Sequence, residues 1–103
     1  MSQYSVLIQQ GQEADKHQQE LIAGVKKIAA DIFDDDADGT PVHWHVVAKG
    51  FAWTGGKPSS TSVIRCDVPD DITYENRVRL LKAITDLWVK QIGIDSNEVT
   101  VTT

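Results

Sequence analysis

One stretch of the sequence, "DDDADGTPVHWH" at residues 34–45, concentrates side chains that could bind a metal ion. It begins like an EF-hand calcium loop, in which oxygen ligands alternate along the chain and glycine stands at position 6. Counted from Asp34, Gly39 falls at position 6, but position 12 is His45 where the loop needs a bidentate glutamate. The residues that follow resemble a strand, whereas an EF-hand continues into a helix. The stretch therefore predicts a turn that leads into a strand.

His43 and His45 form the second possible metal site of this stretch. In an extended strand they point to the same face, about 6.5–7 Å apart. Such a pair can bind one metal, but a zinc site needs at least a third protein ligand. His17 and Cys66 are candidates on other elements. Two interpretations stay open: a metal site, or imidazoles that line a sheet face or a subunit contact. We favour the second, and we expect no metal and no cofactor.

The remaining residues with possible chemistry are scattered along the chain. Arg65 could bind a carboxylate through two parallel hydrogen bonds, or it could be a solvated charge on a strand. Phe51 and Trp53 lie in the glycine-rich stretch "GFAWTGGKPSS", where they could wall a pocket or pack at a subunit interface. Lys49, just before them, could supply a cation or be solvated. Ser2 is either an ordinary early residue or, once Met1 is removed, a reactive N-terminal amine.

Composition limits the partners of this chain. Its 103 residues suffice for one domain with one core. The net charge of −5, with no basic stripe, argues against nucleic acid. The longest apolar runs are too short to span a membrane, and the first residues do not resemble a secretion signal. A single cysteine rules out an internal disulfide framework and fits the cytoplasm, which is the location we expect.

Periodicity of the apolar residues predicts the elements that must position these side chains. Strands are expected at residues 4–9, 42–48, 61–68 and 98–103. One helix should begin near Asp15 as its N-cap and end before the acidic stretch. A second helix should begin after Thr73 or Asp71 and end at Gly93 in a left-handed conformation.

A strand, a crossover helix and a second strand make a parallel βαβ unit. Two such units, at about residues 4–48 and 61–103 and joined by a glycine-rich hairpin at 49–60, predict one α/β (α+β) domain spanning 1–103. We expect a β-α-β-β-α-β fold whose four-stranded sheet carries both helices on one face. If the apolar strand residues divide between the two faces, the second face must also be covered, which argues for an oligomer. These residues are Val6, Ile8, Trp44, Val46, Ile64 and Val99.

With these elements in order, the sequence resembles the tautomerase superfamily over nearly all of its length. The segments that carry the likeness are "SQYSVLIQQG", the first helix, "GFAWTGGKPS" and "TYENRVRLLKAITDLWVKQIGIDSNEVTV". The branch most like it is that of cis-3-chloroacrylic acid dehalogenase. 4-Oxalocrotonate tautomerase and macrophage migration inhibitory factor are more distant. The resemblance implies a homotrimer and a small pocket at the start of the first strand. In that pocket an N-terminal proline acts on small carbonyl or enol acids.

The position of that proline falls on Ser2, so the catalytic proline is absent. Because serine is small, we expect Met1 to be removed, which leaves an α-amine that titrates near about 7.7–8.0. The paired arginines of the dehalogenases are replaced by the acidic "DVPDDIT", so dehalogenation is not expected. Arg65 or Lys49 would then bind a substrate carboxylate, and Phe51 or Trp53 would wall the pocket.

Two function hypotheses follow. The first is a tautomerase-like enzyme that acts through the amine of Ser2 on a small carboxylate or carbonyl ligand. The second is a non-catalytic binding or assembly module with this fold or a ferredoxin-like fold.

Overall fold

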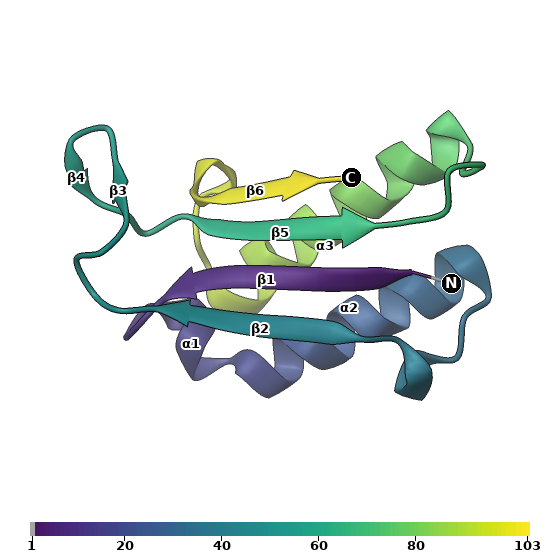
Figure 1. Ribbon diagram of the computed structural model, residues 1–103, viewed down its shortest axis with the longest axis horizontal. Coiled ribbons are helices and arrows are strands. Elements are labelled where there is room, and N and C mark those ends of the chain that lie inside the picture. Colours follow the sequence, from purple (N-terminus) through teal and green to yellow (C-terminus); the bar gives the residue numbers. More distant parts are fainter. Residues whose placement is uncertain (1) are drawn as a thin grey trace.

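Four strands form the main sheet of the computed structural model, which describes residues 2–103. Met1, whose removal the sequence predicts, lies outside these described residues. The strands are β1 (Gln3–Gln9), β2 (Val42–Val47), β5 (Ser62–Asp67) and β6 (Val99–Thr102), in the order β2-β1-β5-β6 (Figure 1). β1 and β2 are parallel, as are β5 and β6, whereas β1 and β5 are antiparallel. Each parallel pair is one of the predicted βαβ units.

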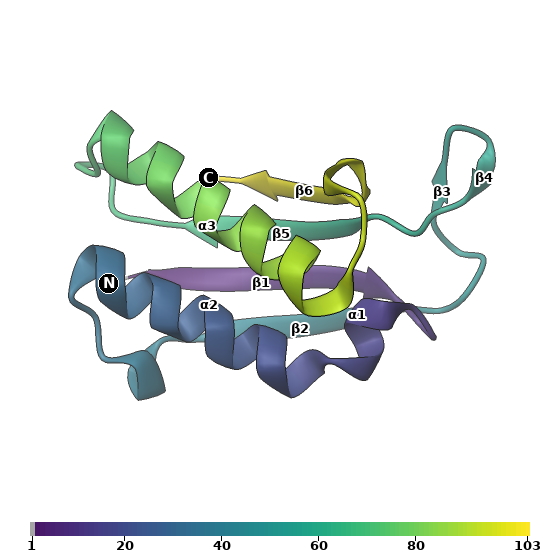
Figure 2. The same cartoon turned by 180° about the vertical axis from the view of Figure 1, so that it is seen from behind.

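Both long helices, α2 (Gln18–Phe33) and α3 (Tyr74–Ile92), cover one face of this sheet, and the other face is open (Figures 1 and 2). The predicted four-stranded α/β architecture is therefore confirmed. α2 and α3 approach closely at Gly24, where an added Cβ would lie 2.6 Å from a methyl carbon of Leu87. The short strands β3 (Trp53–Thr54) and β4 (Lys57–Pro58) form a hairpin that projects beyond one end of the sheet (Figure 1).

The hydrophobic core lies between the helices and the sheet. Tyr4, Val6 and Ile8 alternate along β1 toward the helices and are fully buried, together with Trp88 of α3. The idea that the six apolar strand residues named from the sequence divide between the two faces is wrong. Val6 pairs with Trp44 and Ile64, Ile8 pairs with Val46, and Val99 is buried in the same core. Because cross-strand partners point the same way, all six face the helices.

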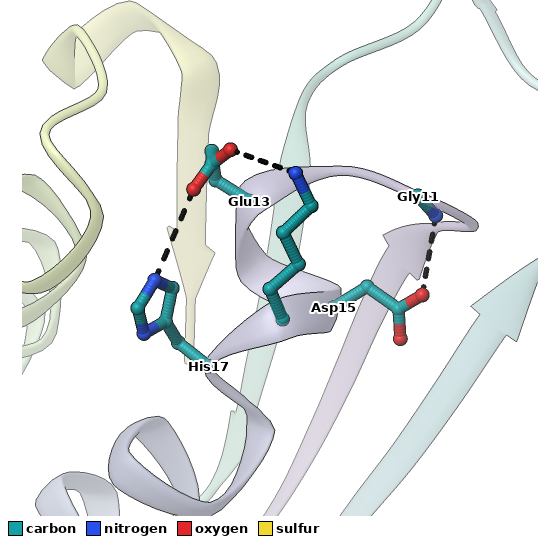
Figure 3. A network of polar contacts seen from close by, with 5 residues as sticks. Gly11, Glu13, Asp15 and His17 are labelled. Atoms are coloured by element: carbon teal, nitrogen blue, oxygen red, sulfur yellow. Dashed lines mark hydrogen bonds and ion pairs between the residues drawn. The ribbon is translucent and has the colours of Figure 1, made fainter.

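The first helical segment differs from the prediction at its start. A short helix α1 (Glu13–Lys16) ends at His17, and α2 begins directly after it, with no side-chain cap on either helix. Asp15 is therefore not an N-cap: its carboxylate accepts a hydrogen bond from the Gly11 amide at 3.1 Å (Figure 3). Glu13 forms an ion pair with Lys16 at 3.2 Å and faces His17 at 3.8 Å across the break.

The caps of α3 are those that the sequence predicts. The Thr73 hydroxyl accepts a hydrogen bond from the Asn76 amide at 3.2 Å, and Gly93 ends the helix with φ = +69°. A left-handed residue satisfies the last carbonyls of a helix, and glycine adopts that conformation without steric cost. α2 ends instead on Asp34, a non-glycine residue with φ = +56°.

The acidic stretch after α2 is a turn, as predicted. The Asp36 side chain accepts a hydrogen bond from the Asp38 amide at 3.1 Å at the start of the 3-10 turn η1 (Ala37–Gly39). The Thr40 hydroxyl donates to the Asp36 carbonyl at 2.9 Å. A second 3-10 turn, η2 (Ser96–Glu98), leads into β6. Within residues 2–103, no helix has both the length and the apolar character that crossing a membrane requires.

Candidate functional site

A cavity of about 300 Å³ lies at the start of β1, where the chain enters the sheet. It forms because β1 begins between the segment that precedes β2 and the segment that follows β5: the Tyr4 amide donates to the Pro41 carbonyl at 3.0 Å, and Gln3 pairs with Asp67. The residues that line the cavity are Ser2, Gln3, Pro41, Asp67, Val68 and Pro69. None of these described residues is a lysine or an arginine.

Ser2 is held at this cavity by a short chain of hydrogen bonds. It is only 2% exposed, and its hydroxyl donates to the Asp35 carboxylate at 3.0 Å. The hydroxyl of the fully buried Tyr4 donates in turn to Ser2 Oγ at 3.0 Å. Burial raises the pKa of Tyr4 to about 12, so the phenol keeps its proton and remains a donor at neutral pH. The left-handed turn at Asp34 brings Asp35 back toward Ser2.

A second hollow, of about 410 Å³, lies on the open face of the sheet. Its residues are Gln3, Ser5, His43, His45, Arg65 and Asp67. His43 and Arg65 both pair with Ser5, one from each side. Because neighbouring strands are about 4.8 Å apart, the two longer side chains flank the small serine across roughly 10 Å. The arrangement offers an imidazole, a hydroxyl and a guanidinium to one small anionic group.

The two hollows meet at a shared wall. Gln3 and Asp67 line both, and the Gln3 amide donates to the Asp67 carboxylate at 3.0 Å. The hydroxyl of Ser2 nevertheless lies on the helix side of the sheet, with Tyr4, whereas Arg65 is exposed on the open side. Arg65, on β5, also lies opposite Ser5, which is three residues along the chain from Ser2, or roughly 10 Å. Ser2 and Arg65 thus lie in adjoining hollows rather than in one.

The other predicted site residues lie at the opposite end of the sheet. Lys49, Phe51 and Trp53 belong to the loop and hairpin that Figure 1 shows beyond the far end of β1. At about 3.3 Å per residue, the seven residues of β1 span roughly 23 Å. Phe51 is 83% exposed and Trp53 63%, and the Trp53 ring N–H donates to the Gly50 carbonyl at 2.8 Å. Within one protomer these side chains do not reach Ser2.

His43 and His45 share one face, as the alternation predicts, and both are exposed there. Among residues 2–103, no group of three or more histidine, cysteine or acidic side chains is placed to hold a metal ion. Cys66 is buried on the helix side, and burial raises the pKa of its thiol to about 12. A protonated thiol is a poor metal ligand, because metals bind the thiolate.

Tyr4, Asp35, Ser5 and Asp67 border the site but were not singled out from the sequence. Alternation alone could have grouped Ser5 with the open face. No local pattern in the sequence indicates the register of β1 against β5, which brings Asp67 beside Gln3. The contact between Ser2 and Asp35 joins residues 33 apart and depends on how α2 ends.

Similarity to known proteins is seen in structure. No protein-family model matches this chain, and no curated protein matches its sequence. The native structure of Ps01740 is similar with a TM-score of 0.89 and 24% identity over 97% of this chain and 89% of that one. A symmetric trimer of wild-type fused 4-OT has a TM-score of 0.83 and 16% identity, over 97% and 81% of the two chains. Pt0534 inactivated by 2-oxo-3-pentynoate has a TM-score of 0.85 and 19% identity, also over 97% and 81%.

These structures define the class of fold. All three are tautomerase-superfamily structures, so this chain has the tautomerase fold, as its sequence resemblance implies. In that fold the start of β1, where Ser2 lies, is the place at which the resemblance expects a reactive N-terminal residue.

Proposed function

We propose that this protein converts a small enol carboxylate into its keto form through the α-amine of Ser2, freed by removal of Met1. The observation that carries the proposal is the burial of Ser2 beside a cavity at the start of β1, in a chain with the tautomerase fold. Serine brings a primary amine to this position in place of the proline ring.

The surroundings of Ser2 suit an amine that gives a proton. The carboxylate of Asp67 lines the same cavity, and a nearby negative charge favours the protonated form of an amine. In ketonisation the ammonium donates a proton to the enol carbon while the enol O–H proton leaves to water. The amine then recovers a proton from water. The substrate carboxylate binds in the adjoining hollow, where Arg65 supplies the positive charge.

A second candidate is a binding module without turnover. The absence of any cation among the described residues that line the Ser2 cavity favours this candidate. In that case an anion occupies the Arg65 hollow, and no proton transfer occurs.

Ketonisation of phenylenolpyruvate, followed by its ultraviolet absorbance, separates the two. We expect turnover by protein whose first residue is Ser2, and none once the amine is acetylated. Arg65→Ala should raise KM with little change in kcat, because it removes binding common to ground and transition states. Arg79→Ala, which removes an exposed arginine on α3, is the matched control and should leave both constants unchanged. Binding of phenylpyruvate without turnover would favour the module.

Covalent trapping tests the amine directly. Pt0534 is inactivated by 2-oxo-3-pentynoate. If the Ser2 amine is nucleophilic, it adds to the alkyne carbon remote from the carbonyl, and the neighbouring carbon takes up a proton. Mass spectrometry of the N-terminal peptide should then show one added reagent. Modification confined to lysine side chains would count against the enzyme.

We also propose that the protein assembles as a homotrimer. Similar structures of fused 4-OT are trimers, and the exposed aromatic rings of Phe51 and Trp53 lie on a projecting hairpin. In such an assembly a hairpin from a second copy can supply the aromatic and cationic groups that one protomer keeps away from Ser2. Sedimentation should give three times the chain mass, and Phe51→Ser with Trp53→Ser should lower it. A monomer at high concentration would contradict this assembly.

A further inference from the structure

An amine at the start of a strand has one rotation that matters for its position. Once Met1 is removed, the nitrogen of Ser2 is attached only to its own Cα. Rotation about the Cα–C bond then swings the nitrogen and Cβ together. Any contact that holds the serine hydroxyl therefore also restricts where the amine lies. A proline, which has no such hydroxyl, could not be held in this way.

Two hydrogen bonds, each to a different residue, hold the Ser2 hydroxyl. Tyr4, fully buried, donates to Ser2 Oγ at 3.0 Å, and Ser2 donates to Asp35 at 3.0 Å. Both lengths are those of ordinary hydrogen bonds, and the second is charge-assisted because its acceptor is a carboxylate. The raised pKa of Tyr4 keeps the direction of donation fixed near neutral pH.

Asp35 itself is held by the backbone around it. It follows Asp34, whose left-handed conformation ends α2, and it precedes Asp36, which is fixed by the Asp38 amide and the Thr40 hydroxyl. Asp67, the other carboxylate at the cavity, is engaged by Gln3 instead. Asp35 is thus the carboxylate that reaches the serine hydroxyl.

We propose that Asp35 and Tyr4 are positioning residues that fix the Ser2 amine at the cavity through its hydroxyl. The inference rests on the proposed function for its catalytic consequence, since it says how a primary amine gains the fixed geometry that a proline ring has. Asp35 is hydrogen-bonded to Ser2 but is not among the residues that line the cavity. Its effect should therefore appear in kcat rather than in KM.

The main comparison uses Asp35→Ala, which removes the acceptor, and Asp35→Asn, which keeps an acceptor oxygen but not the charge. Asp38→Ala, in the same turn, is the matched control, since Asp38 is exposed and the Ser2 hydroxyl bonds to Asp35 and Tyr4 instead. All proteins are prepared with Ser2 as the first residue by cleavage of a removable leader. A displacement of about 1 Å can cost 10²-fold in rate, so Asp35→Ala should lower kcat about 10- to 100-fold at unchanged KM. Asp35→Asn should restore most of this loss.

A second readout does not depend on turnover. Reductive methylation with ¹³C-formaldehyde places two methyl groups on the Ser2 amine. Their NMR shifts depend on the groups that surround the nitrogen, so they approach the shifts of a dimethylated serine at the start of an unfolded peptide when the amine is no longer held at the cavity. We expect shifts displaced from the peptide values for the wild type, Asp35→Asn and Asp38→Ala, and shifts close to the peptide values for Asp35→Ala.

These outcomes distinguish the two proposals. Displaced methyl shifts that return to the peptide values in Asp35→Ala, in a protein without turnover, support the positioning role and overturn the proposed enzyme. Turnover that is unchanged in Asp35→Ala, or displaced shifts that persist in it, overturns the positioning role alone. Peptide-like shifts in the wild type also overturn it.

Discussion

The hydrogen bonds around Ser2 predict an unequal response to removal of their two hydroxyls. Tyr4→Phe removes a donor and leaves Ser2 bonded to Asp35, so it should cost about 1 kcal/mol, the net value of one hydrogen bond. Ser2→Ala leaves the hydroxyl of a fully buried tyrosine without a partner. Because an unpaired buried polar group costs a further ~1–3 kcal/mol, this change should destabilise by about 2–3 kcal/mol.

The double variant tests this asymmetry. With both hydroxyls gone, no buried phenol is left unpaired, and the Asp35 carboxylate, which is only partly buried, can bond to water instead. The combined cost should therefore return to about 1 kcal/mol. The coupling energy is then about −2 to −3 kcal/mol, well beyond the ~0.5 kcal/mol scatter of independent sites. Urea unfolding measures each free energy, provided that the slope m is unchanged. As a control, Ser5→Ala on the open face should shift stability by less than about 0.5 kcal/mol and add to Tyr4→Phe. Additive costs for Ser2 and Tyr4 would refute the reasoning.

Three further predictions concern other parts of the fold, each measured by the free energy of unfolding. Asp34→Gly should stabilise by about 0.5–1.5 kcal/mol, because it relieves a left-handed non-glycine residue and removes a negative charge from a helix C-terminus; a destabilised protein would contradict this. Thr73→Ala should destabilise by about 1 kcal/mol through loss of the α3 cap, and Thr73→Ser should restore it. Burial raises the pKa of both Cys66 and Tyr4 to about 12, from 9.0 and 10.0. The unfolded chain therefore loses these protons first, and stability should fall as the pH rises from about 9 toward 12, less steeply in Cys66→Ala; a slope unchanged by Cys66→Ala would show that burial of this thiol is not the cause.

Local signals in the sequence were enough for most of the elements. Strand alternation placed His43 and His45 on one face, and Thr73 and Gly93 marked the two ends of α3. The predicted start of the first helix was wrong, because the Asp15 side chain bonds back to the Gly11 amide and the helix breaks at His17. Propensity cannot anticipate that choice, since an aspartate can cap a helix or a preceding turn equally well.

The sequence did not predict how charge and apolar surface are distributed over the two faces of the sheet. The sequence suggested that apolar strand residues divide between the faces. In the structure the six residues considered all face the helices, whereas Leu7, Val47 and Val63 point to the open face. That face is otherwise mostly polar, with Arg65 and His43 around Ser5. Which way a short apolar run points depends on its partners across the sheet, and a register shift of one residue inverts it.

The sequence alone thus determined the order of elements and the tautomerase-like architecture, because apolar periodicity and caps act over a few residues. Through the resemblance to the tautomerase superfamily, it also indicated residue 2 as a candidate site residue. Only the tertiary structure decided that Ser2 is buried and bonded to Asp35 and Tyr4, that Arg65 lies in an adjoining hollow, and that Phe51 and Trp53 lie at the far end. Those relations join segments tens of residues apart, and they are set by strand register and by how α2 ends rather than by any local pattern.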